Sequence, residues 1–135
     1  MKKYQLFSNG KWSDAVSGKE FDVINPATGQ VLTQVPEGDK ADIDLAVKAA
    51  RRAFDEGPWS KISTSERGKL LRKVAQGIRD RADELAELDT LDCGKPISDT
   101  THVDVPVAAE FFEYFAGMPD KIVGQTIPLS DDFLN

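Results

Sequence analysis

The chain has one cysteine, no long apolar run and no basic surface, and each absence excludes a class of protein. Cys93 alone cannot form a disulfide within the chain. No apolar stretch approaches the roughly 20 residues that a membrane helix needs. The net charge of −6 and the pI near 4.8 oppose nucleic-acid binding, which depends on clustered Lys and Arg. The short run Arg51-Arg52 is typical of a solvated helix face.

Glycine is also too widely spaced to form a phosphate-binding loop. Of the ten glycines, the nearest pair is Gly117 and Gly124, whereas a loop that cradles a pyrophosphate needs closely spaced glycines before a helix. We therefore predict no cofactor-binding residue in this chain.

A reaction centre is missing from the pattern as well. Cys93 follows Asp92 at the end of a predicted helix, where the helix dipole disfavours a thiolate. His102 is the only histidine, and nothing around it would hold it as a base beside Cys93. The acidic pair Asp131-Asp132 is typical of a solvated turn. We predict no catalytic residue here.

What is present is the composition of an ordinary globular domain. The 135 residues are 40% hydrophobic and 30% charged, which is enough for one domain with its own core. The start, Met1-Lys2-Lys3, leads into the polar segment 4–9 instead of a signal-peptide core. We predict a cytoplasmic protein.

Two β-hairpins open the chain. Residues 5–7 and 11–12 flank Asn9-Gly10, a strong hairpin signal because both residues tolerate a positive φ. Residues 21–24 and 30–35 then bracket a turn, Asn25-Pro26-Ala27-Thr28-Gly29, in which proline fixes one φ and glycine can take a positive one.

About four helices follow. Asp39 is a good N-cap for the first, which Gly57-Pro58 stops. The segment 63–66 is a capping box, with Ser63 and Glu66 satisfying amides at the start of a second helix. The apolar pattern breaks near residues 80–83 and resumes until Gly94, a natural helix stop.

The last predicted helix begins near Asp104, carries Pro106 in its first turn and ends at Gly117. Residues 125–129 then read as an extended strand. The fold class predicted for the chain alone is α+β: N-terminal hairpins, about four helices and a C-terminal strand.

The apolar faces of these helices allow two interpretations. They can converge as a small bundle, or lie against a partner. The residues predicted to form the bundle are Ile43, Val47, Phe54, Leu70, Leu71, Val74, Ile78, Leu85 and Leu88.

Eight short segments together resemble a known family. They occur in the same order as in the N-terminal part of the NAD(P)-dependent aldehyde dehydrogenases: residues 9–12, 24–29, 46–54, 58–59, 66–71, 91–96, 114–117 and 124–128. The resemblance implies an α/β family fold with a Rossmann-like cofactor domain, of which residues 1–123 would be the N-terminal part. Residues 124–135 would begin the oligomerisation arm, so a homo-oligomer is expected.

The resemblance also implies a reaction. Members of the family oxidise an aldehyde to a carboxylic acid with NAD or NADP, through a thiohemiacetal on a cysteine and a glutamate-activated water. In the family's order the cysteine, the glutamate and the cofactor-binding strands come after the segments matched here. We therefore expect a fragment that is inactive alone.

Two pairs of residues keep a conditional role through the resemblance. The residue before Asn-Pro and the aspartate of the Leu-Asp-x-Gly-Lys-Pro segment map onto Ile24 and Asp92, as ligands of K+ or Na+; carbonyl and carboxylate oxygens suit such a hard cation. The other interpretation is that Asp92 caps or pairs at a helix end. Val107 and Phe111 map near the substrate tunnel, although apolar helix residues are often plain core.

The sequence leaves one alternative from another class. The chain could be a non-catalytic scaffold or interaction module that binds a partner through its exposed helix faces. An assay for aldehyde-dependent NAD reduction discriminates the two. The identity of the aldehyde and the choice between NAD and NADP are not encoded in these residues.

Overall fold

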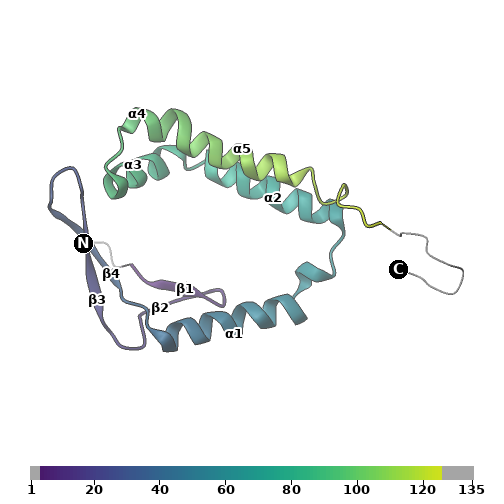
Figure 1. Ribbon diagram of the computed structural model, residues 1–135, viewed down its shortest axis with the longest axis horizontal. Helices are drawn as coiled ribbons and strands as arrows, with labels where there is room; N and C mark the ends of the chain where they lie inside the picture. The colour runs from purple at the N-terminus through teal and green to yellow at the C-terminus, as the bar shows by residue number, and fades with distance from the viewer. Residues whose placement is uncertain (1–3, 126–135) are drawn as a thin grey trace, which may run out of the picture.

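The computed structural model describes residues 4–125 and places them in an open frame (Figure 1). One long helix, α1 (Lys40–Glu56), lies opposite the paired helices α2 (Thr64–Arg79) and α5 (Val105–Ala116). A β-hairpin closes the frame on one side, and the short 3-10 helix η1 (Pro58–Ser60) lies on the other. The predicted strand at 125–129 falls, after Gln125, outside the described residues.

The first hairpin is confirmed. Strands β1 (Leu6–Ser8) and β2 (Lys11–Ser13) pair antiparallel. Their turn residues, Asn9 and Gly10, have φ angles of 52° and 74°, the left-handed pair that a tight two-residue hairpin requires.

The second hairpin is also confirmed. Strand β3 (Glu20–Ile24) pairs antiparallel with β4 (Val31–Pro36), with an irregular register at Val23/Ile24. The Asn25 side chain accepts a hydrogen bond from the Ala27 amide at 2.8 Å, and its carbonyl accepts one from Gly29 at 2.8 Å. The side chain and the carbonyl of Asn25 therefore stabilise the turn by accepting hydrogen bonds from amides within it.

Side chains at two helix starts fix where the helices begin. Asp39 caps α1 as predicted, and Asp42 completes a capping box that the sequence analysis missed. Asp42 also accepts a hydrogen bond from the Val16 amide at 3.0 Å. The backbone hydrogen bonds from Asp39 and then Val16 lower the pKa of Asp42. The predicted capping box of α2 is present, with Ser63 and Glu66 bonded reciprocally.

The next helix has the boundaries that the sequence indicates. Helix α2 ends at Arg79, and α3 (Ala82–Cys93) begins two residues after Asp80. Gly94 caps α3 with a φ of 72°, so the helix stops where a left-handed residue is available.

The last helix begins where predicted: α5 has Asp104 as its N-cap, Pro106 in its first turn and Gly117 as its C-cap. The sequence analysis missed the helical residues before it, because α4 (Ile97–Asp99) and the π-helical turn η2 (Thr100–Asp104) lead into α5 without a break. Proline usually ends a helix because it lacks an N–H and its ring meets the carbonyl four residues earlier. Pro106 comes two residues after the π turn and stands in the first turn of α5, a position that proline tolerates.

The predicted bundle of large apolar residues is wrong. On α1, Ile43, Val47 and Phe54 are 59%, 60% and 69% exposed, and on the other helices Leu70, Val74 and Leu88 remain more than 40% exposed. The predicted residues Leu71, Ile78 and Leu85 are half-buried.

The core instead lies between α2 and α5 and consists of small residues. Ala75, Ala109 and Ala116 are buried, as is Gly68. A Cβ atom on Gly68 would lie 2.5 Å from the Ala116 carbonyl oxygen. The two backbones therefore approach each other across glycine and alanine, and hydrophobic periodicity did not reveal this seam because large side chains dominate that signal.

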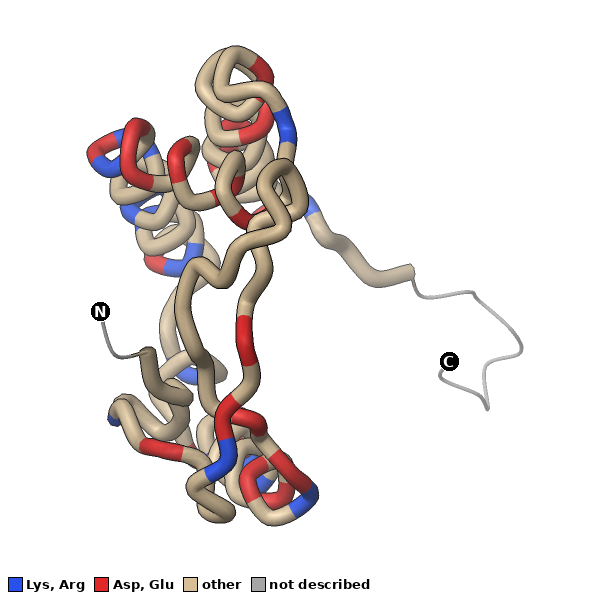
Figure 2. Tube along the Cα trace, turned by 90° about the vertical axis from the view of Figure 1, so that its left-hand side faces the viewer, with Lys and Arg blue, Asp and Glu red and all other residues tan. Residues whose placement is uncertain are grey.

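Among the described residues, charges of both signs are spread over the helices, and no basic stripe runs along them (Figure 2). None of the helices within residues 4–125 combines the length and apolar content needed to cross a bilayer.

Candidate functional site

The Asn25–Gly29 turn meets the C-terminal end of α3. A Cβ atom on Gly94 would lie 2.8 Å from Pro26 Cγ and 3.9 Å from the Ala27 nitrogen. Glycine at position 94 is thus required both by its positive φ and by this approach. The contact brings together two segments that are far apart in the sequence and that carry Ile24 and Asp92.

These two residues stand on opposite sides of that junction. Ile24 is the last residue of β3, next to the register irregularity, and Asp92 is exposed in the last turn of α3. Beside them, a hollow of about 430 Å³ separates the second hairpin from α3. The lining residues are mostly apolar, with two carboxylates: Tyr4, Val23, Leu32, Thr33, Val35, Leu88, Asp89, Leu91 and Asp92.

The donors fit a weakly held cation only in part. A backbone carbonyl and a carboxylate are suitable ligands for K+ or Na+, and both occur at this junction. Within residues 4–125, however, no three His, Cys, Asp or Glu side chains converge as a metal cluster. Ile24 and Asp92 could therefore supply only part of a coordination shell, and their role stays a prediction.

Cys93 does not have the surroundings of a nucleophile. Its thiol is exposed, and a hydrogen bond with Asp89, together with the negative charges of Asp89 and Asp92, raises its pKa. A raised pKa lowers the thiolate fraction at neutral pH. His102 is occupied elsewhere, because its Nδ1 donates to the Ser98 carbonyl at 2.9 Å. The structure does not bring Cys93 and His102 together as a catalytic pair.

Val107 and Phe111 share one side of α5. Val105, Ala109 and Ala116 are buried on the other side, which faces α2, whereas Val107 is 38% and Phe111 59% exposed. Phe111 lies 6.5 Å from Phe115 between ring centroids. The exposed face is thus apolar and aromatic, and it is open to whatever packs or binds against it.

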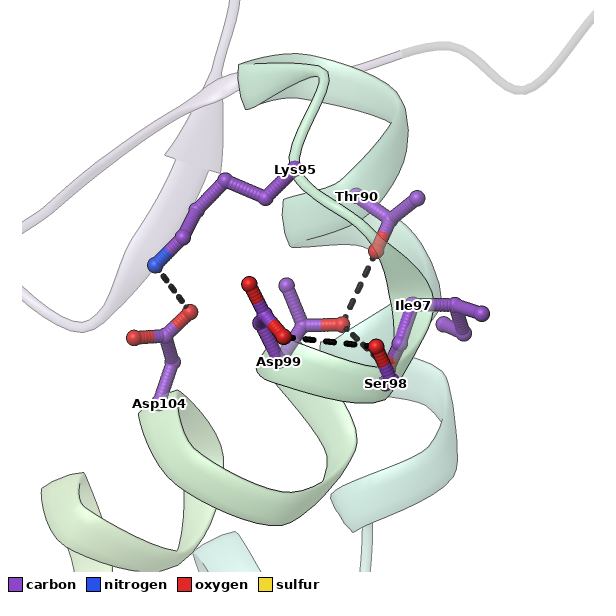
Figure 3. Close-up of polar contacts among 7 residues, drawn as sticks. Thr90, Lys95, Ile97, Ser98, Asp99 and Asp104 are labelled. Carbon is purple, nitrogen blue, oxygen red and sulfur yellow. Dashed lines mark hydrogen bonds and ion pairs between the residues drawn. The ribbon is translucent and has the colours of Figure 1, made fainter.

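A polar junction at the start of this helix was missed by the sequence analysis (Figure 3). Thr100 is fully buried; its hydroxyl lies 3.1 Å from the Ile97 carbonyl oxygen and 2.8 Å from the Thr90 hydroxyl. Lys95 forms an ion pair with Asp104. Threonine is common on exposed helix faces, so only the fold could show that this one is enclosed.

No described residue forms a cradle for a dinucleotide. The glycines with a positive φ, Gly10, Gly18, Gly29 and Gly94, stand in turns or at a helix end. None of them leads directly into the start of a helix, as a phosphate loop does. The positive-φ glycines of the described residues therefore do not form the kind of loop that holds an NAD pyrophosphate.

Comparisons with known proteins place the chain in one class. The sequence profile of the aldehyde dehydrogenase family matches residues 12–135. Aldehyde dehydrogenase 1 of Tanacetum cinerariifolium is 49% identical over 129 residues, covering 96% of this chain and 26% of the relative. The human mitochondrial aldehyde dehydrogenase is 48% identical over 132 residues, covering 97% of this chain and 26% of that protein.

Solved structures agree. The NAD+ complex of an aldehyde dehydrogenase from Bacillus cereus matches with a TM-score of 0.93 and 45% identity, over 98% of this chain and 27% of that one. An NAD-dependent aldehyde dehydrogenase from Sinorhizobium meliloti matches with a TM-score of 0.90 and 39% identity, over the same shares. This chain belongs to the aldehyde dehydrogenase family, and it spans about a quarter of the length of these relatives.

Proposed function

We propose that the chain is the N-terminal part of an enzyme that oxidises an aldehyde to a carboxylic acid with NAD+ or NADP+. The observation that carries this proposal is the match to the Bacillus cereus enzyme solved with NAD+, which extends over 98% of the chain at a TM-score of 0.93. Residues 1–123 would form part of the Rossmann-like cofactor-binding domain, and residues 124–135 would begin an oligomerisation arm.

In this proposal the chain builds the frame of the enzyme and supplies no reacting group. The seam of small residues between α2 and α5 fixes α5, whose exposed face then offers Val107 and Phe111 to the aldehyde. Apolar side chains can select the aldehyde by its hydrocarbon part, since each buried methylene contributes about 0.8 kcal/mol. The junction of Ile24 and Asp92 would hold K+ or Na+ at the far corner of the frame.

A chimera tests the proposal. Residues 4–125 should replace the matching segment of the Bacillus cereus aldehyde dehydrogenase, and NADH formation from propanal should be followed at 340 nm. We expect a folded chimera with aldehyde-dependent activity, because the segment preserves the frame. A chimera that folds to the parental oligomer but forms no NADH would refute the proposal.

The 135-residue chain alone should form no NADH from aldehyde and NAD+. The reason is the lack of a phosphate loop and of a thiol with a lowered pKa. Activity that survives Cys93→Ala would contradict this expectation, and activity that is lost in that variant would identify Cys93 as the nucleophile.

The cation site has its own test. In the chain alone, Ile24 and Asp92 should bind K+ weakly, because they supply few of the oxygens that such an ion needs. The melting temperature in KCl should equal that in tetramethylammonium chloride. A rise specific to K+ that disappears in Asp92→Ala, but persists in Asp89→Ala, would show that the site is already complete.

The alternative function, a non-catalytic interaction module, predicts a stable complex with a partner and an inactive chimera. The exposed apolar faces of α1 and α5 suit such a role as well. A cytoplasmic location and a homo-oligomeric state complete the proposal; they are tested by fractionation and by sedimentation of the complete enzyme.

A further inference from the structure

Three sets of polar contacts stabilise the π turn before α5: a backbone hydrogen bond, a pair of hydroxyl hydrogen bonds and an ion pair. Within the turn, the Val105 amide donates to the Thr100 carbonyl, five residues back. Thr100 has one hydroxyl proton, and the Ile97 carbonyl can only accept, so Thr100 donates to Ile97 and accepts from Thr90. The resulting hydrogen-bond chain runs from α3 through the π turn to the carbonyl of Ile97 in α4 (Figure 3).

An ion pair adds a second tether at the other end of the turn. Lys95, in the loop after α3, pairs with Asp104, the last residue of the π turn. The Asp104 side chain is 32% exposed and that of Lys95 44%, so solvent screens the pair and its contribution is modest. The buried hydroxyl of Thr100, at 0% exposure, is the stronger constraint because a buried polar group is costly to leave unbonded.

The π turn determines which residues of α5 face outward. A π turn contains one residue more than an α-helical turn, and each helical residue turns the chain by about 100°. If the turn relaxed to α-helical geometry, Val107 and Phe111 would rotate by about that angle relative to α3 and α4. The same rotation would move Val105, Ala109 and Ala116 out of their packing against α2.

We propose that Thr100 is a positioning residue for the aldehyde specificity of the enzyme, acting by locking the π turn that sets the angle of α5. The inference rests on the proposed function, because it takes Val107 and Phe111 as the residues that meet the aldehyde. Thr100 itself is buried away from solvent and touches no substrate. It acts through the rotation of the helix that follows it.

The test compares Thr100→Val, which keeps the shape of the side chain but removes the hydroxyl, with Thr100→Ser, which keeps the hydroxyl. Both are made in the chimera with the Bacillus cereus enzyme. For Thr100→Val, we expect kcat/KM to fall roughly 10-fold to 100-fold, more for a long aldehyde such as decanal than for propanal, because reacting groups are misplaced. The KM for NAD+ should not change. Thr100→Ser should keep the relative activity toward decanal and propanal of the parental chimera.

Thr90→Val tests the same hydrogen-bond chain at another residue, because it removes the hydroxyl that donates to Thr100 and leaves Thr100 unchanged. It should shift the decanal-to-propanal preference in the same direction. A uniform loss of activity toward all aldehydes in both variants, with an unchanged preference, would indicate a purely structural role and overturn the proposal.

Hydrogen exchange measures how firmly the π turn is held, and it does not require an active enzyme. In Thr100→Val, amides in residues 100–106 should exchange at least about tenfold faster, while residues 44–56 of α1, on the opposite side of the frame (Figure 1), keep their rates. Unchanged exchange in residues 100–106 would overturn the proposal. An inactive parental chimera whose Thr100→Val variant shows this faster exchange would refute the proposed function and still support the lock.

Discussion

Replacing Gly68 with alanine should weaken the contact between α2 and α5. The added Cβ would lie 2.5 Å from the Ala116 carbonyl oxygen, whereas a carbon–oxygen contact needs at least about 3.3 Å. The obstacle is backbone, so the helices must move apart by several tenths of an ångström. That movement would loosen the packing of Ala75 and Ala109, which are 1% and 0% exposed.

Gly77→Ala is the matched control because it lies in the same helix. A Cβ at Gly77 meets nothing within 4 Å, so that variant gains only the better helix propensity of alanine, about 1 kcal/mol. Gly68→Ala gains the same amount and adds the cost of overpacking, typically about 1–3 kcal/mol. The propensity cancels in the difference, so Gly68→Ala should be about 1–3 kcal/mol less stable than Gly77→Ala.

Urea unfolding measures this difference. Far-ultraviolet circular dichroism of the two variants should be recorded at one protein concentration, because association shifts apparent stability. The free energies of unfolding are then compared at equal m-values. If Gly68→Ala proved as stable as Gly77→Ala, the two backbones could not approach as closely as described.

Three further predictions concern charge, the thiol and association. The hydrogen bond from the Ser63 amide lowers the pKa of Glu66. The ionised carboxylate therefore stabilises the fold at neutral pH, and this contribution is lost on acidification below about pH 5. In Glu66→Gln, the free energy of unfolding should fall less steeply as the pH is lowered. An equally steep fall in that variant would contradict the role of the hydrogen bond between Ser63 and Glu66. Because Asp89 raises the pKa of Cys93, Asp89→Asn should speed its alkylation by iodoacetamide at pH 7, and a slower reaction would refute this cause. Phe54 and Phe111 are 69% and 59% exposed, so the chain should sediment at micromolar concentration as a species larger than its 14.8 kDa mass; a monomer would show that the apolar faces need no cover.

Local chemistry in the sequence was sufficient to predict the turns and most caps. Asn9-Gly10, the Ser63–Glu66 box and the Gly94 stop each depend on residues within one turn of the chain, and each is present. Such features are encoded by φ preferences and by side-chain oxygens that bond nearby amides.

Features that depend on distant parts of the chain were not predictable in the same way. Periodicity identified an apolar face on α1 but could not show what covers it, and Phe54 remains exposed. Pro106 indicated the start of α5 correctly, but nothing in the sequence showed that α4 and the π turn lead into it without a break. The positions Ile24 and Asp92 came from resemblance, and the contact between Pro26 and Gly94 supplies a spatial reason for treating their segments together.

The same contact between Pro26 and Gly94 has a consequence for the order of folding. Hairpins and helices form from neighbouring residues within microseconds, whereas joining the second hairpin to the end of α3 closes a long loop and loses chain entropy. During synthesis the turn with Pro26 leaves the ribosome well before Gly94 does, so it must wait for its partner. A bulky residue at position 94 would therefore delay this late closure, and the unjoined hairpin would stay available for pairing with other chains.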